Sequence, residues 1–297
     1  MFWLVENNEQ LQQLKDKNFR KVFIEPIWSN DNLHPSCAGI QGFYFREINY
    51  RKGFVVVVEH SEATSCDLDK VYELIGSYEE IFVRDKKEFL HIVPLKQLSD
   101  IYFISPTDIP DQFPCHDFFY RKYPHILNIG SIIPIVKHYE RCETIFNAVQ
   151  HVFTLPKPQH FEFYNNKATH VFYWIEAMGL KVNPKLFEEY FGVEREWTYS
   201  QFNLKTTTTR PSNSFGGINY AALDKKSGCR EAFIPNNDFL LEIDISAYHP
   251  TLAAQLVDFD FGEGDIHQAF ADMYGVDYKK AKELTFKQLY GGGFKEY

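Results

Sequence analysis

Residues that could perform chemistry are concentrated between positions 239 and 293. Residues 239–244 form an apolar run that closes on an acid, which predicts a buried strand ending at a carboxylate. Pro250 follows at a position that suits the first turn of a helix. We therefore expect Asp244 at a strand–helix junction, where a half-exposed carboxylate can bind a hard cation such as Mg²⁺.

A second cluster has the spacing of a ligand-binding helix. Lys282, Phe286 and Tyr290 lie four residues apart, so a helix would place one cation and two aromatic rings on one face. Such a face can bind a triphosphate and stack a base. Asp277 is a candidate N-cap for this helix, and the glycines at 291–293 are expected to end it.

Another helix is expected between these two features. Asp265 and Gln268 have the N-cap and N3 spacing of a capping box, and Gly275 is positioned to end the helix. Apolar residues recur between them at helical spacing, namely Ile266, Ala269, Phe270, Met273 and Tyr274.

Together these features resemble family A DNA polymerases, the bacterial polymerase I type. Asp244 with its expected strand is similar to motif A, and residues 265–267, Asp-Ile-His, are similar to the start of the fingers helix. The lysine, phenylalanine and tyrosine at four-residue spacing resemble motif B. Residues 206–213 (TTTTRPSN) are similar to the family's T-x-T-G-R segment, and residues 230–235 (REAFIP) to its R-x-A-F segment. The sequence patterns TRPSN (residues 209–213) and DxxAYHP (residues 244–250) resemble a compact phage branch of this family.

This resemblance implies template-directed DNA synthesis, in which a two-metal mechanism transfers a nucleotide from a dNTP to a primer 3′-end. It implies Mg²⁺ as cofactor, Asp244 as catalytic and metal-binding residue, and primer–template DNA and dNTPs as partners. The implied nucleotide-binding residues are Lys279, Lys282, Phe286, Tyr290 and His249. The implied DNA-binding residues are Thr206, Thr208, Arg210 and Arg230.

Six of these residues also have a purely structural interpretation. Asp244 would then be an N-cap acid, Lys282 a solvated helix lysine and Arg210 a turn residue. The two aromatic residues of motif B would pack in a core, and His249 would be a histidine at a helix start. The surrounding motifs favour the functional roles.

The sequence departs from the family at two points. Residues 180–205 are too few for a standard thumb, so we expect a reduced or missing thumb. The family's second catalytic acid lies in motif C, typically His-Asp-Glu, and no such segment follows Tyr290. We therefore expect a fragment or one half of a split polymerase, with motif C on a second chain, and no activity from the isolated chain.

The N-terminal region alternates strand and helix patterns, which predicts a mixed α/β domain. Strands are expected at 21–25, 39–48, 53–60 and 81–83, and helices at 7–17 and 67–75. Further helices are expected at 145–152 and 168–178. Because this domain precedes a polymerase segment, the resemblance implies a ribonuclease-H-like 3′–5′ exonuclease.

Such exonucleases need several carboxylates to bind two metals. The family's D-x-E is best matched by residues 25–27, Glu-Pro-Ile, and isoleucine cannot bind a metal. The family's second metal-binding acid is usually an aspartate in an N-x-x-x-D-like segment. Asp85 and Glu88 do not have the position of that aspartate, and two lysines lie between them. A degenerate exonuclease domain is therefore preferred to the alternative of active proofreading.

The expected fold class is α/β (α+β), in three parts. Residues 1–115 form the exonuclease-like domain, 116–195 a mainly helical connector with a reduced thumb, and 196–297 a partial palm and fingers that carry motifs A and B.

The chain has 297 residues, of which 44% are hydrophobic, and a net charge of −9, which argues against a protein that coats nucleic acid. Residues 199–230 nevertheless carry five cations and one acid, which suits either a basic cleft or an ordinary solvated face. Five scattered cysteines without a C-x-x-C pair indicate a reducing compartment. With neither a signal peptide nor an apolar run of membrane length, we expect a cytoplasmic protein, in the host cytoplasm if viral, with no membrane partner.

Two rival interpretations use the same residues. Residues 244–252 also resemble motif A of family B polymerases, but the Asp-Ile-His helix and the motif B spacing favour family A. The second rival is a noncatalytic nucleic-acid-binding or scaffold protein derived from a polymerase. The missing second acid is its main support.

Overall fold

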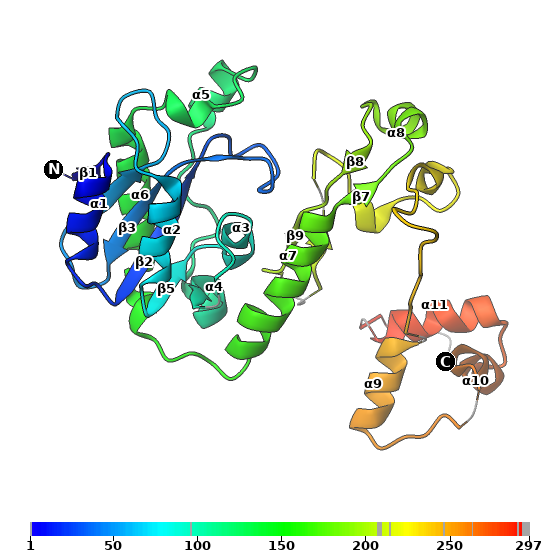
Figure 1. The fold of residues 1–297 in the computed structure, drawn as a ribbon. Coiled ribbons are helices and arrows are strands. Elements are labelled where there is room, and N and C mark those ends of the chain that lie inside the picture. The colour runs from blue at the N-terminus through cyan, green and yellow to red at the C-terminus, as the bar shows by residue number, and fades with distance from the viewer. Residues whose placement is uncertain are drawn as a thin grey trace. The chain divides into compact units, whose positions relative to one another are not determined.

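The computed structural model describes residues 2–95, 97–206, 210–213, 215–245, 247–262, 264–289 and 291–292 (Figure 1). The chain divides into two compact units, Met1–Asp238 and Phe239–Tyr297, which we call unit 1 and unit 2. Among the described residues, no helix combines the length and the apolar character needed to cross a membrane.

A six-stranded mixed sheet forms the centre of unit 1. Its strands are β1 (Trp3–Val5), β2 (Lys21–Trp28), β3 (Ile40–Glu47), β4 (Phe54–Val57), β5 (Glu80–Val83) and β6 (Leu98–Asp100). Their order is β1-β4-β3-β2-β5-β6, and β3 runs antiparallel to both neighbours while the other pairs are parallel. The four strands expected from the sequence are confirmed as β2 to β5. The strands β1 and β6 are too short to show an alternating pattern.

Helices cover both faces of this sheet (Figure 1). One face carries α1 (Asn8–Lys15), α2 (Leu68–Gly76) and α3 (Lys86–Leu90), and the other carries α4 (Ile101–Ile104) and α6 (Ile135–Val149), with α5 (Asp117–Lys122) between these two in the chain. Strand β2 serves both cores because successive side chains point to opposite faces. Val22 and Ile24 pack on the α1–α3 side, whereas Phe23 and Ile27 pack on the α6 side.

The rest of unit 1 follows α6. A 3₁₀ segment (Gln150–Thr154) extends α6, and a π-helical turn (Phe163–Ala168) leads into α7 (Thr169–Met178), so the helices expected at 145–152 and 168–178 are confirmed. Two small two-stranded antiparallel sheets follow, formed by β7 (Leu180–Lys181) with β8 (Trp197–Thr198) and by β9 (Phe202–Asn203) with β10 (Ser212–Asn213). Helix α8 (Pro184–Phe191) packs in a separate small core with Val182 and Ala232.

Unit 2 contains α9 (Tyr248–Leu256), α10 (Ile266–Tyr274) and α11 (Tyr278–Leu289). The predicted caps are confirmed. Asp265 Oδ1 accepts hydrogen bonds from the backbone N–H groups of His267 at 2.7 Å and Gln268 at 3.2 Å. Gly275 ends α10 with φ +64°, a left-handed conformation that glycine adopts without strain. Asp277 Oδ1 accepts from Lys280 N at 2.9 Å at the start of α11.

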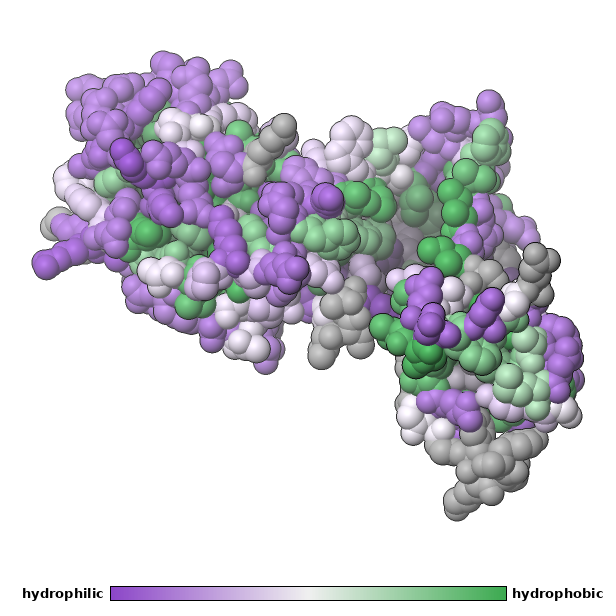
Figure 2. Space-filling model, turned by 90° about the horizontal axis from the view of Figure 1, so that it is seen from below, coloured by the Kyte–Doolittle hydropathy of each residue, from purple (hydrophilic) through white to green (hydrophobic). Residues whose placement is uncertain are grey.

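The buried strand expected over residues 239–244 is wrong. Residues 239–245 are irregular and exposed, with Phe239 74% and Ile243 82% accessible. A strand needs a neighbour for its backbone hydrogen bonds, and none of the described residues pairs with this segment. Figure 2 shows hydrophobic surface on unit 2, and the exposed apolar residues of this unit include Leu240 and Leu241.

Candidate functional site

Helix α11 carries three of the predicted nucleotide-binding residues. Lys279 and Lys282 are exposed, and Phe286 follows Lys282 after one helical turn. The Phe286 ring is half-buried, with its centroid 5.9 Å from that of His267 on α10. Tyr290 lies outside the described residues. The helix therefore presents an ammonium group one turn from an aromatic ring, a combination that can bind a phosphate and stack a base.

Hydrogen bonds from α10 and its N-cap hold both ends of α11 in place. The Tyr278 hydroxyl donates to Asp265 Oδ2 at 3.1 Å, and the Tyr274 hydroxyl donates to Gln288 Oε1 at 3.0 Å. Buried Ala281 lies on the face of α11 that packs inside unit 2. The resulting scaffold fixes the helix face that carries Lys282.

Asp244 lies in the exposed segment 239–245 and is not at the end of a strand. His249 is half-buried in α9, with its ring centroid 5.4 Å from that of Tyr248. A carboxylate is the right ligand type for Mg²⁺. However, the part of the chain that the structure describes holds no group of three or more His, Cys, Asp or Glu side chains suited to a metal. Asp244 therefore does not form a complete metal site with other described residues.

The predicted DNA-binding residues belong to unit 1. Thr206 Oγ1 donates to the Arg210 carbonyl oxygen at 2.7 Å. Thr208 lies outside the described residues. Arg230 donates from Nε and Nη2 to the Leu223 carbonyl oxygen at 3.2 and 2.9 Å. Arg210 is exposed, whereas the guanidinium of Arg230 also supports its own loop.

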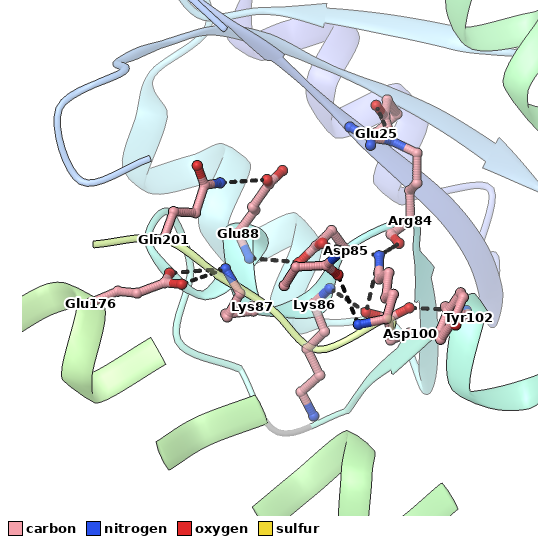
Figure 3. A network of polar contacts seen from close by, with 12 residues as sticks. Glu25, Arg84, Asp85, Lys86, Lys87, Glu88, Asp100, Tyr102, Glu176 and Gln201 are labelled. Atoms are coloured by element: carbon pink, nitrogen blue, oxygen red, sulfur yellow. Dashed lines mark hydrogen bonds and ion pairs between the residues drawn. The ribbon is translucent and has the colours of Figure 1, made fainter. Parts of the chain in front are cut away.

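The first exonuclease-type acid, Glu25, is fully buried on β2 (Figure 3). Arg84 Nε lies 3.1 Å from Glu25 Oε1, and Arg141 Nη2 of α6 lies 3.5 Å from the same oxygen. Ile27 packs in the apolar core on the same side. Two guanidinium groups thus neutralise Glu25.

Asp85 and Asp100 (Figure 3) both accept hydrogen bonds from backbone N–H groups, and Asp85 also accepts one from a lysine. Asp100 accepts from the N–H groups of Tyr102 and Lys86, both at 2.9 Å. Asp85 accepts from the Glu88 N–H at 3.0 Å and from Lys205 Nζ at 3.0 Å. Burial raises the pKa of Asp100 to about 6. Burial alone would also raise the pKa of Asp85, but the nearby ammonium groups outweigh it and hold that pKa below its usual range.

Glu88 and Glu176 complete this polar network. Burial raises the pKa of Glu88 to about 7, and the charge of Asp85 adds to the effect. Fully buried Glu176 of α7 lies 2.8 Å from Lys87 Nζ and 3.2 Å from His91 Nε2. Since every acid of the network has a donor or cation from the chain itself, the arrangement does not fit a two-metal site.

Sequence reasoning missed the basic partners of these acids. Arg141 and Lys205 lie far along the chain from Glu25 and Asp85, and no spacing rule connects them. Lys205 is one of the five cations between residues 199 and 230, and it is committed to an internal ion pair with Asp85 instead of to a basic cleft or a solvated face. The sequence carries a weak indication that Glu176 is buried in an ion pair, since it is an acid among the apolar residues of α7.

Comparison with known proteins gives a likeness of fold. No family model matches this chain, and no curated protein matches it. The POL domain of Pol1 from M. smegmatis, in complex with DNA primer-template and dNTP, is similar with a TM-score of 0.62 at 12% identity, over 97% of this chain and 71% of that chain. The predicted mixed α/β fold class is confirmed, because a mixed six-stranded sheet is followed by a mainly helical segment.

Two ribonucleases are also similar to parts of the chain. RNase D from Escherichia coli has a TM-score of 0.34 at 10% identity, over 60% of this chain and 47% of that one. This chain thus spans about half the length of the E. coli protein. RNase D from Trypanosoma brucei, in complex with RNA U12, has a TM-score of 0.39 at 11% identity. The match covers 66% of this chain and 80% of that chain.

Proposed function

We propose that this chain is the exonuclease-like, connector and partial palm–fingers portion of a compact, phage-type family A DNA polymerase. Its reaction is template-directed nucleotidyl transfer from dNTPs to a primer 3′-end, and the domain limits are those expected at residues 115 and 195. The observation that carries the proposal is the likeness to a polymerase domain over 97% of this chain. The site of action proposed from composition is the cytoplasm, or the host cytoplasm for a viral protein.

The nucleotide-binding roles fall on unit 2. Lys282 contacts the triphosphate, and Phe286 stacks on the incoming base and sugar. Lys279 adds a second positive charge, His249 lies beside the sugar, and Tyr290 occupies the template-base position. The support is the continuous helix α11, which places Lys282 and Phe286 one turn apart on a scaffold fixed by α10.

The DNA-binding roles fall on unit 1. Arg210 contacts the primer terminus, and Thr206 and Thr208 also contact the DNA. The support for this role is the exposed position of Arg210 and the hydrogen bond from the Thr206 hydroxyl to its carbonyl oxygen. Arg230 contributes by holding its loop through Leu223 and by its exposed charge.

Asp244 is the proposed Mg²⁺ ligand and catalytic acid. Mg²⁺ would neutralise charge on the reacting phosphates. Because the described residues supply no complete ligand set, we propose that a second polypeptide with a His-Asp-Glu segment provides another carboxylate. The exposed run 239–245 supports this idea, since it has a strand-like sequence and no partner among the described residues.

Primer extension tests this function. The full chain is incubated with primer–template DNA, dNTPs and Mg²⁺, with and without a polypeptide that carries palm strands and a His-Asp-Glu segment. We expect extension only in the mixture, and we expect Asp244→Asn to abolish it. Robust incorporation by the chain alone, or extension that does not depend on Asp244, would contradict the proposal.

A noncatalytic nucleic-acid-binding or scaffold role is the second candidate. It is favoured by the exonuclease-like site, in which the acids are neutralised by cations of the chain. Fluorescence anisotropy with labelled primer–template separates the two. A scaffold binds DNA with the same affinity whether or not the matching dNTP is present, whereas a polymerase binds DNA more tightly with it.

A further inference from the structure

An ammonium group lies among three oxygen atoms in unit 1. Lys205 Nζ is 2.9 Å from the Arg84 carbonyl oxygen, 3.0 Å from Asp85 Oδ2 and 4.0 Å from Asp100 Oδ2. Carboxylate and carbonyl oxygens are the ligands that Mg²⁺ and Ca²⁺ prefer. These three atoms therefore have the composition of a divalent-cation site, and the cation present is a lysine of the same chain.

Residues 200–206, which we call the strap segment, deliver this lysine to a fixed position. The Ser200 carbonyl oxygen lies 3.1 Å from His34 Nε2, and Gln201 Nε2 donates to Glu88 Oε1 at 2.9 Å. The Phe202 N–H donates to Glu176 Oε1 at 2.5 Å. Ser200 and Gln201 are thus bonded to the exonuclease-like domain, and Phe202 is bonded to Glu176, which itself pairs with Lys87 and His91 of that domain. The backbone that leads to Lys205 is therefore held in place.

Charge explains why a cation is needed at this point. The Asp100 side chain is almost fully buried, and that of Asp85 is 19% exposed. Two carboxylates close together in a buried site repel each other unless a positive charge lies between them. Burial alone would lower the pKa of the Lys205 ammonium, but Asp100 and Asp85 raise it, so the lysine stays charged.

We propose that Lys205 is a tethered counter-ion in a latent divalent-cation site made of Asp85, Asp100 and the Arg84 carbonyl oxygen. The exonuclease-like domain thus keeps its carboxylates without binding a metal at this point. The strap segment ends at Thr206, whose hydroxyl donates to the Arg210 carbonyl oxygen, so the same ion pair also supports this contact. This inference concerns the exonuclease-like domain and does not depend on nucleotidyl transfer.

Removal of the lysine tests the proposal in the full chain. Lys205→Ala should lower the melting temperature in EDTA by on the order of 10 °C, because it leaves two carboxylates without their cation. Added Mn²⁺ should restore part of that loss and give one additional bound ion by electron paramagnetic resonance. The matched control is Lys226→Ala, an exposed lysine of the same basic segment, which should behave as the unaltered protein with no Mn²⁺ response.

A double variant tests which carboxylate binds the metal, and it keeps the proposal testable if Lys205→Ala alone folds poorly. Asp85→Asn combined with Lys205→Ala removes one carboxylate together with the lysine, so it should fold better than Lys205→Ala and lose the extra Mn²⁺. The proposal is overturned if the unaltered protein binds Mn²⁺ in a manner that Asp85→Asn abolishes. It is also overturned if folded Lys205→Ala gains no Mn²⁺, or if the double variant is no more stable than Lys205→Ala.

Discussion

Two acids follow similar apolar runs and have opposite environments. Glu25 lies in a central strand of unit 1, buried between Arg84 and Arg141, whereas Asp244 lies in an exposed, irregular segment of unit 2. The runs have similar strand propensity, so the difference comes from the neighbours. Strand β2 has β3 and β5 to satisfy its backbone, and residues 239–245 have no such partner among the described residues.

This contrast separates two uses of a carboxylate. Glu25 is committed to the fold, because its charge is balanced by side chains that are themselves buried or half-buried. Asp244 is accessible, so a ligand or another polypeptide can reach it. Stability should therefore depend on the first acid and activity on the second.

The largest effect is expected from Glu25→Ala. It leaves Arg84 and Arg141 without their shared anion, and removal of one partner of a buried pair costs about 3–5 kcal/mol of unfolding free energy. Denaturant unfolding monitored by circular dichroism measures this loss. Asp244→Ala is the matched comparison and should leave the unfolding midpoint unchanged. Equal responses of the two variants would remove the distinction between a structural and an accessible acid.

Glu176→Ala should have the next largest effect. The change leaves Lys87 and His91 without their carboxylate and the Phe202 N–H without its acceptor, so we expect a loss of about 2–4 kcal/mol. Hydrogen exchange should then accelerate in the strap segment before it does so in the central sheet. Uniform acceleration across unit 1 would show that Glu176 does not hold the strap segment specifically.

Local rules predicted the elements whose signals are local. The caps Asp265, Asp277 and Gly275 were readable because each acts within four residues of its own position. Strands β2 to β5 could be predicted because neighbouring strands in the same region satisfy their backbone hydrogen bonds. Helix α11 could be predicted from the four-residue spacing that includes Lys282 and Phe286, together with the cap at Asp277.

The remaining features depend on contacts between distant parts of the chain. The strand expected at 239–244 failed because strand formation needs a partner, which propensity cannot supply. The pairs Glu25–Arg141 and Asp85–Lys205 join residues more than a hundred positions apart. Sequence spacing could therefore identify the acids as candidates, but it could not show that cations of the chain neutralise them.

Unit 2 can be tested by nucleotide binding. Lys282→Ala removes a charge-assisted contact to phosphate, which should weaken dNTP binding by about 1.5–3 kcal/mol, or roughly 10- to 150-fold in Kd. Lys280→Ala is the control, because Lys280 is an exposed lysine of the same helix that pairs with Glu283 at 3.4 Å. Titration with a fluorescent dNTP measures both. Equal weakening by the two variants would indicate general electrostatics instead of a site on the Lys282 face.

The smallest effect is a pH dependence that belongs to unit 1. Glu88 has a pKa of about 7 in the folded chain, chiefly because it is buried and next because Asp85 is negative, while Arg84, Lys87 and Lys205 oppose the rise. Its pKa in the unfolded chain is about 4.3. Between these values the folded state holds a proton that the unfolded state has released, so the unfolding free energy falls as pH rises.

Glu88→Gln should remove this fall while keeping an oxygen that accepts from Gln201 Nε2. Because Glu88 is half-buried, solvent screening reduces the expected size. The unaltered chain should therefore lose on the order of 1–2 kcal/mol more than the variant between about pH 5 and pH 8. Asp100 titrates in part of the same window and is present in both proteins, so its contribution cancels in the difference. The opposite outcome is that the unaltered chain gains stability relative to Glu88→Gln as pH rises. Glu88 would then be ionised in the folded chain and paired with the nearby cations, which contradicts a raised pKa.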